Sequence, residues 1–158
     1  MESTTQGVLI LTMENFRNYE RISVPPLCEI WNWEGDKSIL PIKWSDALRS
    51  TFGIEIDDKT LKEKYSDNEN FDPLGFFFVT YRSNTIGNCL VFKDENDLYW
   101  IRFLVAAKEY REKKLEEAMV GLAIEYMNTQ KSDISTLYIK PFDDFQAEIL
   151  KEIGFEDE

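Results

Sequence analysis

The order of the apolar segments in the second half of the chain constrains the fold more than any other feature of the sequence. Three apolar runs follow one another at residues 76–81, 85–92 and 98–106, with only short polar segments between them. Runs of this length with tight connections are typical of antiparallel strands. From residue 115 to residue 127 the apolar positions then recur with a period of 3.6, which indicates a helix. We therefore predict a three-stranded antiparallel meander, followed by a long helix that packs on the sheet.

The start of the chain carries weaker patterns. A β-branched and leucine-rich run at residues 8–13 predicts a strand, and residues 14–22 predict a short helix. Pro25 and Pro26 then interrupt regular structure, because proline fixes φ and restricts the residue before it. From there to Pro41 we expect a loop with one helical turn.

Two helices are predicted before the meander. Residues 44–52 have apolar positions on one helical face, and Gly53 follows as a helix C-terminus requires. Residues 57–65 begin with acidic side chains and end with lysines, which matches the helix macrodipole.

The end of the chain predicts a strand and a well-capped helix. Residues 135–139 form a short apolar run, which we expect to pair in parallel after the long helix. Asp143 and Gln146 have the spacing of a capping box that opens a helix. Gly154 suits the C′ position of that helix, and Phe155 is placed to fold back on it.

Composition indicates one soluble domain over residues 1–158. A chain of 158 residues with 43% hydrophobic residues can bury a core without disulfides. Its 30 acidic and 18 basic residues give a net charge of −12, so we expect no binding to nucleic acid or membranes. The acidity would attract a basic protein partner or an amine substrate, or it confers solubility alone. We expect a cytoplasmic protein, since no apolar segment approaches a membrane span and the start MESTTQG lacks the features of a signal peptide.

The residue inventory excludes several chemistries. The chain has no histidine, and Cys28 and Cys89 are its two cysteines. Zinc sites of the usual Cys/His kind, Ser-His-Asp triads and Cys-His dyads are therefore excluded, and we expect no metal. Carboxylates, tyrosines, lysines and water remain as proton carriers, and the sequence assigns no catalytic residue among them.

This order of elements resembles the GCN5-related N-acetyltransferases (GNAT) from roughly residue 44 to residue 155. The resemblance is carried by the segments LVAAKEYREKKLEEAMVGLAIEYM and LYIKPFDDFQAEILKEIGF. It implies an α/β fold with a mixed, mostly antiparallel sheet flanked by helices. It also implies acetyl-CoA as cofactor and an amine as acceptor.

The resemblance places the cofactor at the start of the long helix. In that family an Arg/Gln-x-x-Gly-x-Gly/Ala motif lies there, and Arg111 is similar to its first residue. The backbone around Ala106 and the side chain of Asp143, which stands where the family often has asparagine, are then expected at the cofactor. Lys114 and Glu116 occupy the two glycine positions of the motif.

These departures predict a weak cofactor site. Glycines let a pyrophosphate approach the N–H groups at a helix start, and side chains crowd that approach. A carboxylate a few ångströms from a phosphate is also unfavourable by roughly 1 kcal/mol or more. Leu150 stands where the family usually has a tyrosine that protonates the leaving thiolate, and leucine cannot donate a proton.

Basic residues near this loop have two interpretations. Lys108, Lys113 and Lys114 would grip a phosphate with their side chains, or they form a solvated face with the glutamates between them. Arg102 lies within an apolar run, so it would recognise a carboxylate in an acceptor pocket, or its head group reaches water or an acidic side chain.

Two tryptophans form a second candidate for substrate binding. Trp31 and Trp33 lie among Glu29, Glu34 and Asp36, which together would form an aromatic and acidic lip for a cationic amine. The alternative is that both rings only pack in the core or against a loop.

Three functions remain open from the sequence. The first is a GNAT-like protein with a degraded acetyl-CoA loop, weakly active or inactive. The second is a working acetyl-CoA-dependent N-acetyltransferase, and the third is an acidic module that binds a basic protein. Only residues 156–158 follow the last helix, where the family has a further strand. We therefore expect that the last helix leaves one edge of the sheet unpaired. Either residues 8–13 pair with this edge, or a second chain pairs with it in a homodimer.

Overall fold

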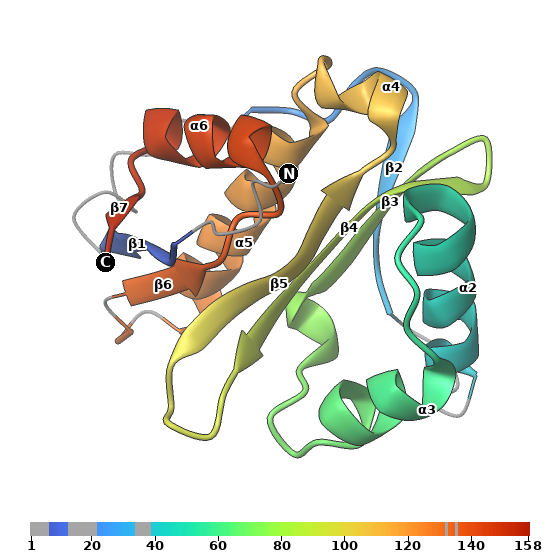
Figure 1. The fold of residues 1–158 in the computed structure, drawn as a ribbon, viewed down its shortest axis with the longest axis horizontal. Coiled ribbons are helices and arrows are strands. Elements are labelled where there is room, and N and C mark those ends of the chain that lie inside the picture. The colour runs from blue at the N-terminus through green and yellow to red at the C-terminus, as the bar shows by residue number, and fades with distance from the viewer. Residues whose placement is uncertain (1–6, 13–21, 34–38, 132, 135) are drawn as a thin grey trace.

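The computed structural model describes residues 7–12, 22–33, 39–131, 133–134 and 136–158 (Figure 1). Within these residues, seven strands form one sheet in the order β2-β3-β4-β5-β6-β1-β7. The predicted meander is confirmed, because consecutive strands pair antiparallel. These strands are β3 (Phe76–Tyr81), β4 (Asn84–Lys93) and β5 (Tyr99–Ala106). The chain then forms α5 (Leu115–Gln130) and crosses to β6 (Thr136–Ile139), which pairs in parallel with β5 as predicted.

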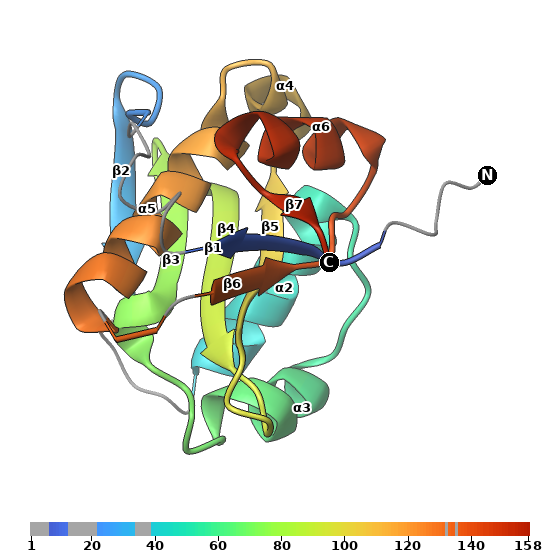
Figure 2. The same ribbon diagram turned by 90° about the vertical axis from the view of Figure 1, so that its left-hand side faces the viewer.

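Helices cover both faces of the sheet (Figures 1 and 2). On one side lie α2 (Leu40–Phe52) and α3 (Asp58–Leu61), and α3 continues into a π-helical turn at Lys62–Ser66. On the other side lie α5 and α6 (Asp144–Ile153). One apolar core lies on each side, as expected for a sheet covered on both faces. No helix of the described residues is long and apolar enough to span a membrane.

Strand β1 (Leu9–Thr12) covers the sheet edge that was predicted to be unpaired. It pairs antiparallel with β6, and its other side carries the short β7 (Glu156–Asp157). Leu9 and Leu11 of β1 are buried in the core. Of the two expected ways to cover this edge, the structure shows the one within the chain.

The prediction of a loop between Pro26 and Pro41 is wrong in two places. Cys28–Asn32 forms strand β2, which pairs antiparallel with β3 at the end of the sheet. The three central residues of β2 are exposed, so neither face of this strand is buried. The sequence therefore lacks the alternation of apolar and polar residues that would have predicted a half-buried strand. α2 begins at Leu40 rather than at residue 44, because proline is tolerated in the first turn of a helix. The predicted helix at 14–22 lies outside the described residues, apart from Ile22.

The predicted caps of α6 are confirmed. The Asp143 carboxylate accepts a hydrogen bond from the Gln146 backbone N–H at 2.9 Å. Gly154 has φ 129°, a conformation that favours glycine, and the Phe155 N–H donates to the Leu150 carbonyl at 3.0 Å. These caps set the two ends of α6, and its first turn contacts the start of α5 through Gln146 and Glu116, where the candidate site lies.

Candidate functional site

The end of β5 is irregular at the point where the resemblance places a cofactor. Asn88 on β4 pairs with Val105 and Leu90 pairs with Arg102, so β5 contains one extra residue in this stretch. Phe103 has φ 53° there, which completes a β-bulge. The Asn88 side-chain amide donates to the freed Phe103 carbonyl at 3.1 Å.

From the bulge onward, β5 has no paired strand on the side of β6. Its parallel pairing with β6 runs from Tyr99 to Ile101 and stops, and the two strands then diverge (Figure 1). The side chain of Gln146, from α6, enters this gap and donates to the Leu104 carbonyl at 2.8 Å. Gln146 is buried, so α6 is held against the open side of β5 by a hydrogen bond shielded from water.

The loop that joins β5 to α5 contains a residue with a left-handed backbone. After the short helix α4 (Lys108–Arg111), Lys114 stands at the N-cap of α5 with φ 63° and ψ 30°. This left-handed conformation is favoured by glycine and is unfavourable for lysine. Glycine therefore suits this position of the loop, although the chain has lysine there.

The side chains at this helix start form a closed ion-pair network around Arg111. Glu116 contacts one side of the guanidinium and Asp143 the other, and each carboxylate uses both of its oxygens. The distances are 3.0 Å from Nε to Glu116 Oε2, 3.2 Å from Nη2 to Glu116 Oε1, 2.7 Å from Nη1 to Asp143 Oδ2 and 2.9 Å from Nη2 to Asp143 Oδ1. Gln146 Nε2 also donates to Glu116 Oε1 at 2.8 Å. The residues Arg111, Glu116, Asp143 and Gln146 are called the Arg111 network below.

Burial makes this network strong. Only 1% of Glu116 is exposed, against 21% of the Arg111 side chain and 33% of Asp143. The hydrogen bonds to Asp143 and Glu116 raise the pKa of Arg111, and the guanidinium in turn lowers the pKa of Asp143. The Phe145 ring also covers the guanidinium, with 4.6 Å between Cζ and the ring centroid. The guanidinium of Arg111 is thus matched by two carboxylates, and it has no unmatched charge to offer a phosphate.

A pocket of about 290 Å³ adjoins the network. The end of α2 contributes Thr51 and Phe52 to its wall, and Phe142 closes it from the loop before α6. The structure thus brings together three of the predicted cofactor residues, Ala106, Lys108 and Arg111, as lining residues of this pocket.

The remaining predicted cofactor residues do not line this pocket. Asp143 joins the Arg111 network rather than lining the pocket. The Lys113 ammonium lies over the Tyr110 ring, 5.1 Å from its centroid. Lys114 is exposed at the N-cap of α5.

The predicted acceptor residues lie apart from this pocket. The Arg102 guanidinium stacks on the Trp100 ring, with Cζ 4.4 Å from the centroid, and borders a separate polar groove with Tyr65 and Asp94. Trp31 stacks on Phe78 and donates to Thr80 Oγ1 at 2.9 Å.

Trp33 lines a second pocket, under α2, with Phe78 among its neighbours. Two of the acidic residues predicted to form a lip with it, Glu34 and Asp36, lie outside the described residues. The predicted amine lip therefore stays a prediction.

The sequence analysis did not predict the contacts that three residues make in this site. Glu116 was expected only to crowd and repel a phosphate, yet it binds Arg111 directly. Gln146 was expected only as a helix cap, yet its side chain reaches Leu104. Phe145 was not considered. The capping-box spacing was the one signal that pointed to Gln146, and contacts across 30 or 32 residues leave no periodic trace in a sequence.

Solved structures show the fold of this chain. No family model matches the sequence, and no curated protein does. Among solved structures, a GCN5-related N-acetyltransferase from Sphaerobacter thermophilus superposes with a TM-score of 0.70, at 11% identity over 96% of this chain and 48% of that one. A tandem GNAT protein from the clavulanic acid biosynthesis pathway gives 0.66, at 12% identity over 96% and 50%. The chain has the GNAT fold.

A third neighbour is a predicted acetyltransferase from Clostridium acetobutylicum, solved with acetyl-CoA. It gives a TM-score of 0.60 at 13% identity, over 83% of this chain and 91% of that one. The chain thus spans about half of the length of the first two neighbours and most of the third. The α/β class and the mixed, mostly antiparallel sheet expected from the resemblance are confirmed by this GNAT fold. Within the described residues, no group of three potential ligands could hold a metal ion.

Proposed function

We propose that this chain is an acetyltransferase-like protein whose phosphate cradle is occupied by its own side chains. Acetyl-CoA then binds weakly, and acetyl transfer is slow or absent. The observation that supports this proposal is the buried carboxylate of Glu116, bonded to Arg111 and Gln146 at the start of α5. It lies at the helix N-terminus, where the GNAT resemblance expects a pyrophosphate.

A diphosphate would have to compete with this internal anion. To bind Arg111 it must displace Glu116 or Asp143, and displaced Glu116 would remain buried beside a second anion. Removing one partner from a buried ion pair typically costs about 3–5 kcal/mol. A penalty of this size weakens binding by roughly a hundredfold or more. The residues at this helix start therefore do not fit the phosphates of acetyl-CoA.

The position expected to supply a proton is also unsuited to catalysis. Leu150 stands where the family usually has its tyrosine, and it is fully buried in the core beside α5. Its side chain has no proton to donate to a leaving thiolate. Loss of the cradle and loss of the donor are independent, and both favour a protein with little or no transferase activity.

A gain-of-function experiment tests this proposal. Lys114→Gly with Glu116→Gly removes the internal anion and two side chains, so acetyl-CoA should bind at least tenfold more tightly, by about 1.4 kcal/mol. The matched control is Glu112→Gly with Lys113→Gly, which makes the same change of charge and adds the same glycines outside the Arg111 network. Binding is measured by calorimetric titration, and cooperative urea unfolding shows that each variant is folded.

The outcomes separate the two enzymatic hypotheses. Tighter binding in the first variant alone supports the occupied cradle. Equal binding in both variants would show that the cradle does not lie at residues 111–116. Release of free thiol from acetyl-CoA by the unaltered chain with an amine would instead establish a working acetyltransferase, which uses the pocket beside Ala106 and Lys108.

A further inference from the structure

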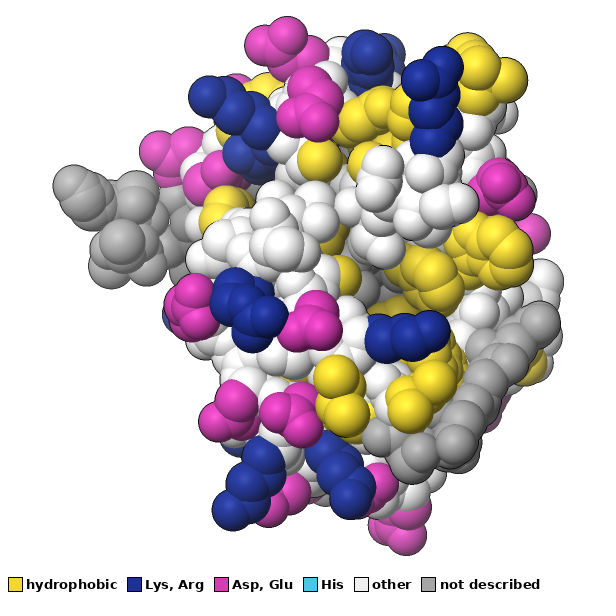
Figure 3. All heavy atoms as spheres, turned by 90° about the vertical axis from the view of Figure 1, so that its right-hand side faces the viewer, with side chains coloured by type: hydrophobic (Ala, Val, Ile, Leu, Met, Phe, Trp, Pro, Cys, Tyr) yellow, Lys and Arg dark blue, Asp and Glu magenta, His cyan; other side chains and the backbone are white. Residues whose placement is uncertain are grey.

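The pocket under α2 is distinct from the Arg111 network. It has a volume of about 190 Å³ and lies between the first half of α2 and strands β2 to β4. Aromatic rings form much of its wall: Trp33, Trp44, Phe76 and Phe78. Hydrophobic side chains gather toward the right of this face of the molecule, and charged side chains of both signs lie above them, to their left and below (Figure 3). The walls therefore suit a flat apolar group.

The four tryptophans of the chain differ in their indole N–H groups. Trp31 donates to Thr80 Oγ1 at 2.9 Å, and Trp100 donates to Asp94 Oδ2 at 2.7 Å. The N–H groups of Trp33 and Trp44 are buried and have no acceptor, and both residues line this pocket. Only 3% of Trp44 is exposed, so water has little access to it. Buried donors without an acceptor are rare in proteins, and here two such donors lie at one pocket.

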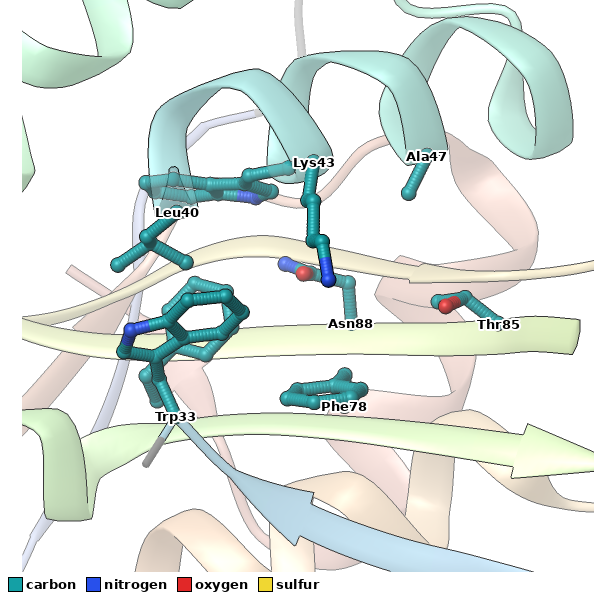
Figure 4. A pocket seen from close by; sticks show the side chains of 9 residues that line it. Trp33, Leu40, Lys43, Ala47, Phe78, Thr85 and Asn88 are labelled. Carbon is teal, nitrogen blue, oxygen red and sulfur yellow. The ribbon is translucent and has the colours of Figure 1, made fainter. Parts of the chain in front are cut away.

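The charge at this pocket is opposite to that of the chain. Lys43 extends from α2 toward Asn88 on β4, across the space above Phe78 (Figure 4). None of the described lining residues is acidic, although the whole chain has a net charge of −12. Thr85 and Asn88 add polar groups on the same side as the ammonium (Figure 4). The pocket thus combines hydrogen-bond donors, a cation and aromatic walls.

We propose that this pocket binds a small aromatic carboxylate. The aromatic ring lies among Trp33, Trp44 and Phe78, and the carboxylate pairs with Lys43. Its oxygens accept from the unpartnered indole N–H of Trp44, whereas the indole nitrogen of Trp33 lies on the edge of its ring away from Lys43 (Figure 4). The volume of this pocket is smaller than the range of volumes usual for pockets that bind drug-sized ligands, so it fits a single ring system with one acid group. This site needs no acetyl-CoA and does not depend on the state of the Arg111 network.

The indole N–H groups provide a direct test by NMR. The full chain, labelled with ¹⁵N, is titrated with benzoate, benzamide and benzylamine, which share a ring and differ in charge. Benzoate should saturably shift the indole signals of Trp33 and Trp44 and leave Trp100 unchanged. The Trp44 signal should move downfield, because a new hydrogen bond forms there, and the Trp33 signal should move because the benzoate ring packs against its indole. Single Trp→Phe variants assign the four signals. Benzamide should bind about fivefold more weakly, since it lacks the charge that pairs with Lys43.

A lysine pair serves as the matched control. Lys43→Met should weaken benzoate binding about fivefold and leave benzamide binding unchanged. Lys59→Met, on exposed α3, makes the same change of net charge and should have no effect. Three results would each overturn the proposal. These are tighter binding of benzylamine than of benzoate, no saturable shift of the Trp33 and Trp44 signals, and equal effects of the two lysine substitutions.

Discussion

Replacing Glu116 with leucine tests whether the Arg111 network is a buried ion pair that the fold depends on. Leucine is similar in size but cannot accept the three hydrogen bonds that Glu116 receives, two from Arg111 at 3.0 and 3.2 Å and one from Gln146 at 2.8 Å. Removing one partner of a buried pair costs about 3–5 kcal/mol. Arg111 keeps Asp143 and is partly exposed, and Gln146 keeps the Leu104 carbonyl. We therefore expect a loss near the lower limit, about 3 kcal/mol of unfolding free energy.

Urea unfolding, followed by tryptophan fluorescence, measures this loss. The double variant Arg111→Met with Glu116→Leu should lose less unfolding free energy than the sum of the two single losses, because the contact between Arg111 and Glu116 is then removed only once. A Glu116→Leu variant within about 0.5 kcal/mol of the unaltered chain would refute the reasoning. So would a double variant whose loss equals the sum of the two single losses.

Three further predictions follow from individual residues. Lys114→Gly should stabilise the fold by about 0.5–1 kcal/mol, because Lys114 has φ 63°, a conformation that favours glycine. The control Lys113→Gly should not stabilise the fold. A loss of unfolding free energy in Lys114→Gly, measured by urea unfolding, would contradict this prediction. Asp143→Asn should destabilise the chain near neutral pH. The lowered pKa of Asp143 means that its stabilising effect is present above its ordinary pKa of 3.8 and is lost as the pH falls through the folded value. The difference in unfolding free energy between the two proteins should therefore shrink below about pH 4, and a constant difference would contradict the role of Arg111. Leu11→Ala should cost about 2–5 kcal/mol, because Leu11 is fully buried in β1, and a neutral result would show that β1 does not cover β6.

Much of the fold was predictable because it follows from local patterns. Apolar runs and short turns predicted the meander, and the broad apolar stripe predicted α5. The caps of α6 follow from side chains three or four residues apart, as at Asp143 and Gln146. β2 was missed because an exposed edge strand carries no apolar alternation.

The site was less predictable because its contacts are long-range. Arg111 was expected to bind a cofactor, and the sequence could not show that Glu116 and Asp143 converge on it from α5 and from the loop before α6. The left-handed backbone of Lys114 at the N-cap of α5 could not be predicted either, because φ at one residue cannot be inferred from side-chain periodicity.

The most direct test of the occupied cradle is a calorimetric titration of acetyl-CoA into the unaltered chain at physiological salt. If Glu116 and Asp143 fill the place of the pyrophosphate, the titration should show no saturable binding at micromolar concentrations of acetyl-CoA. A micromolar or tighter dissociation constant would contradict the account, because the phosphates would then bind despite the buried carboxylate of Glu116.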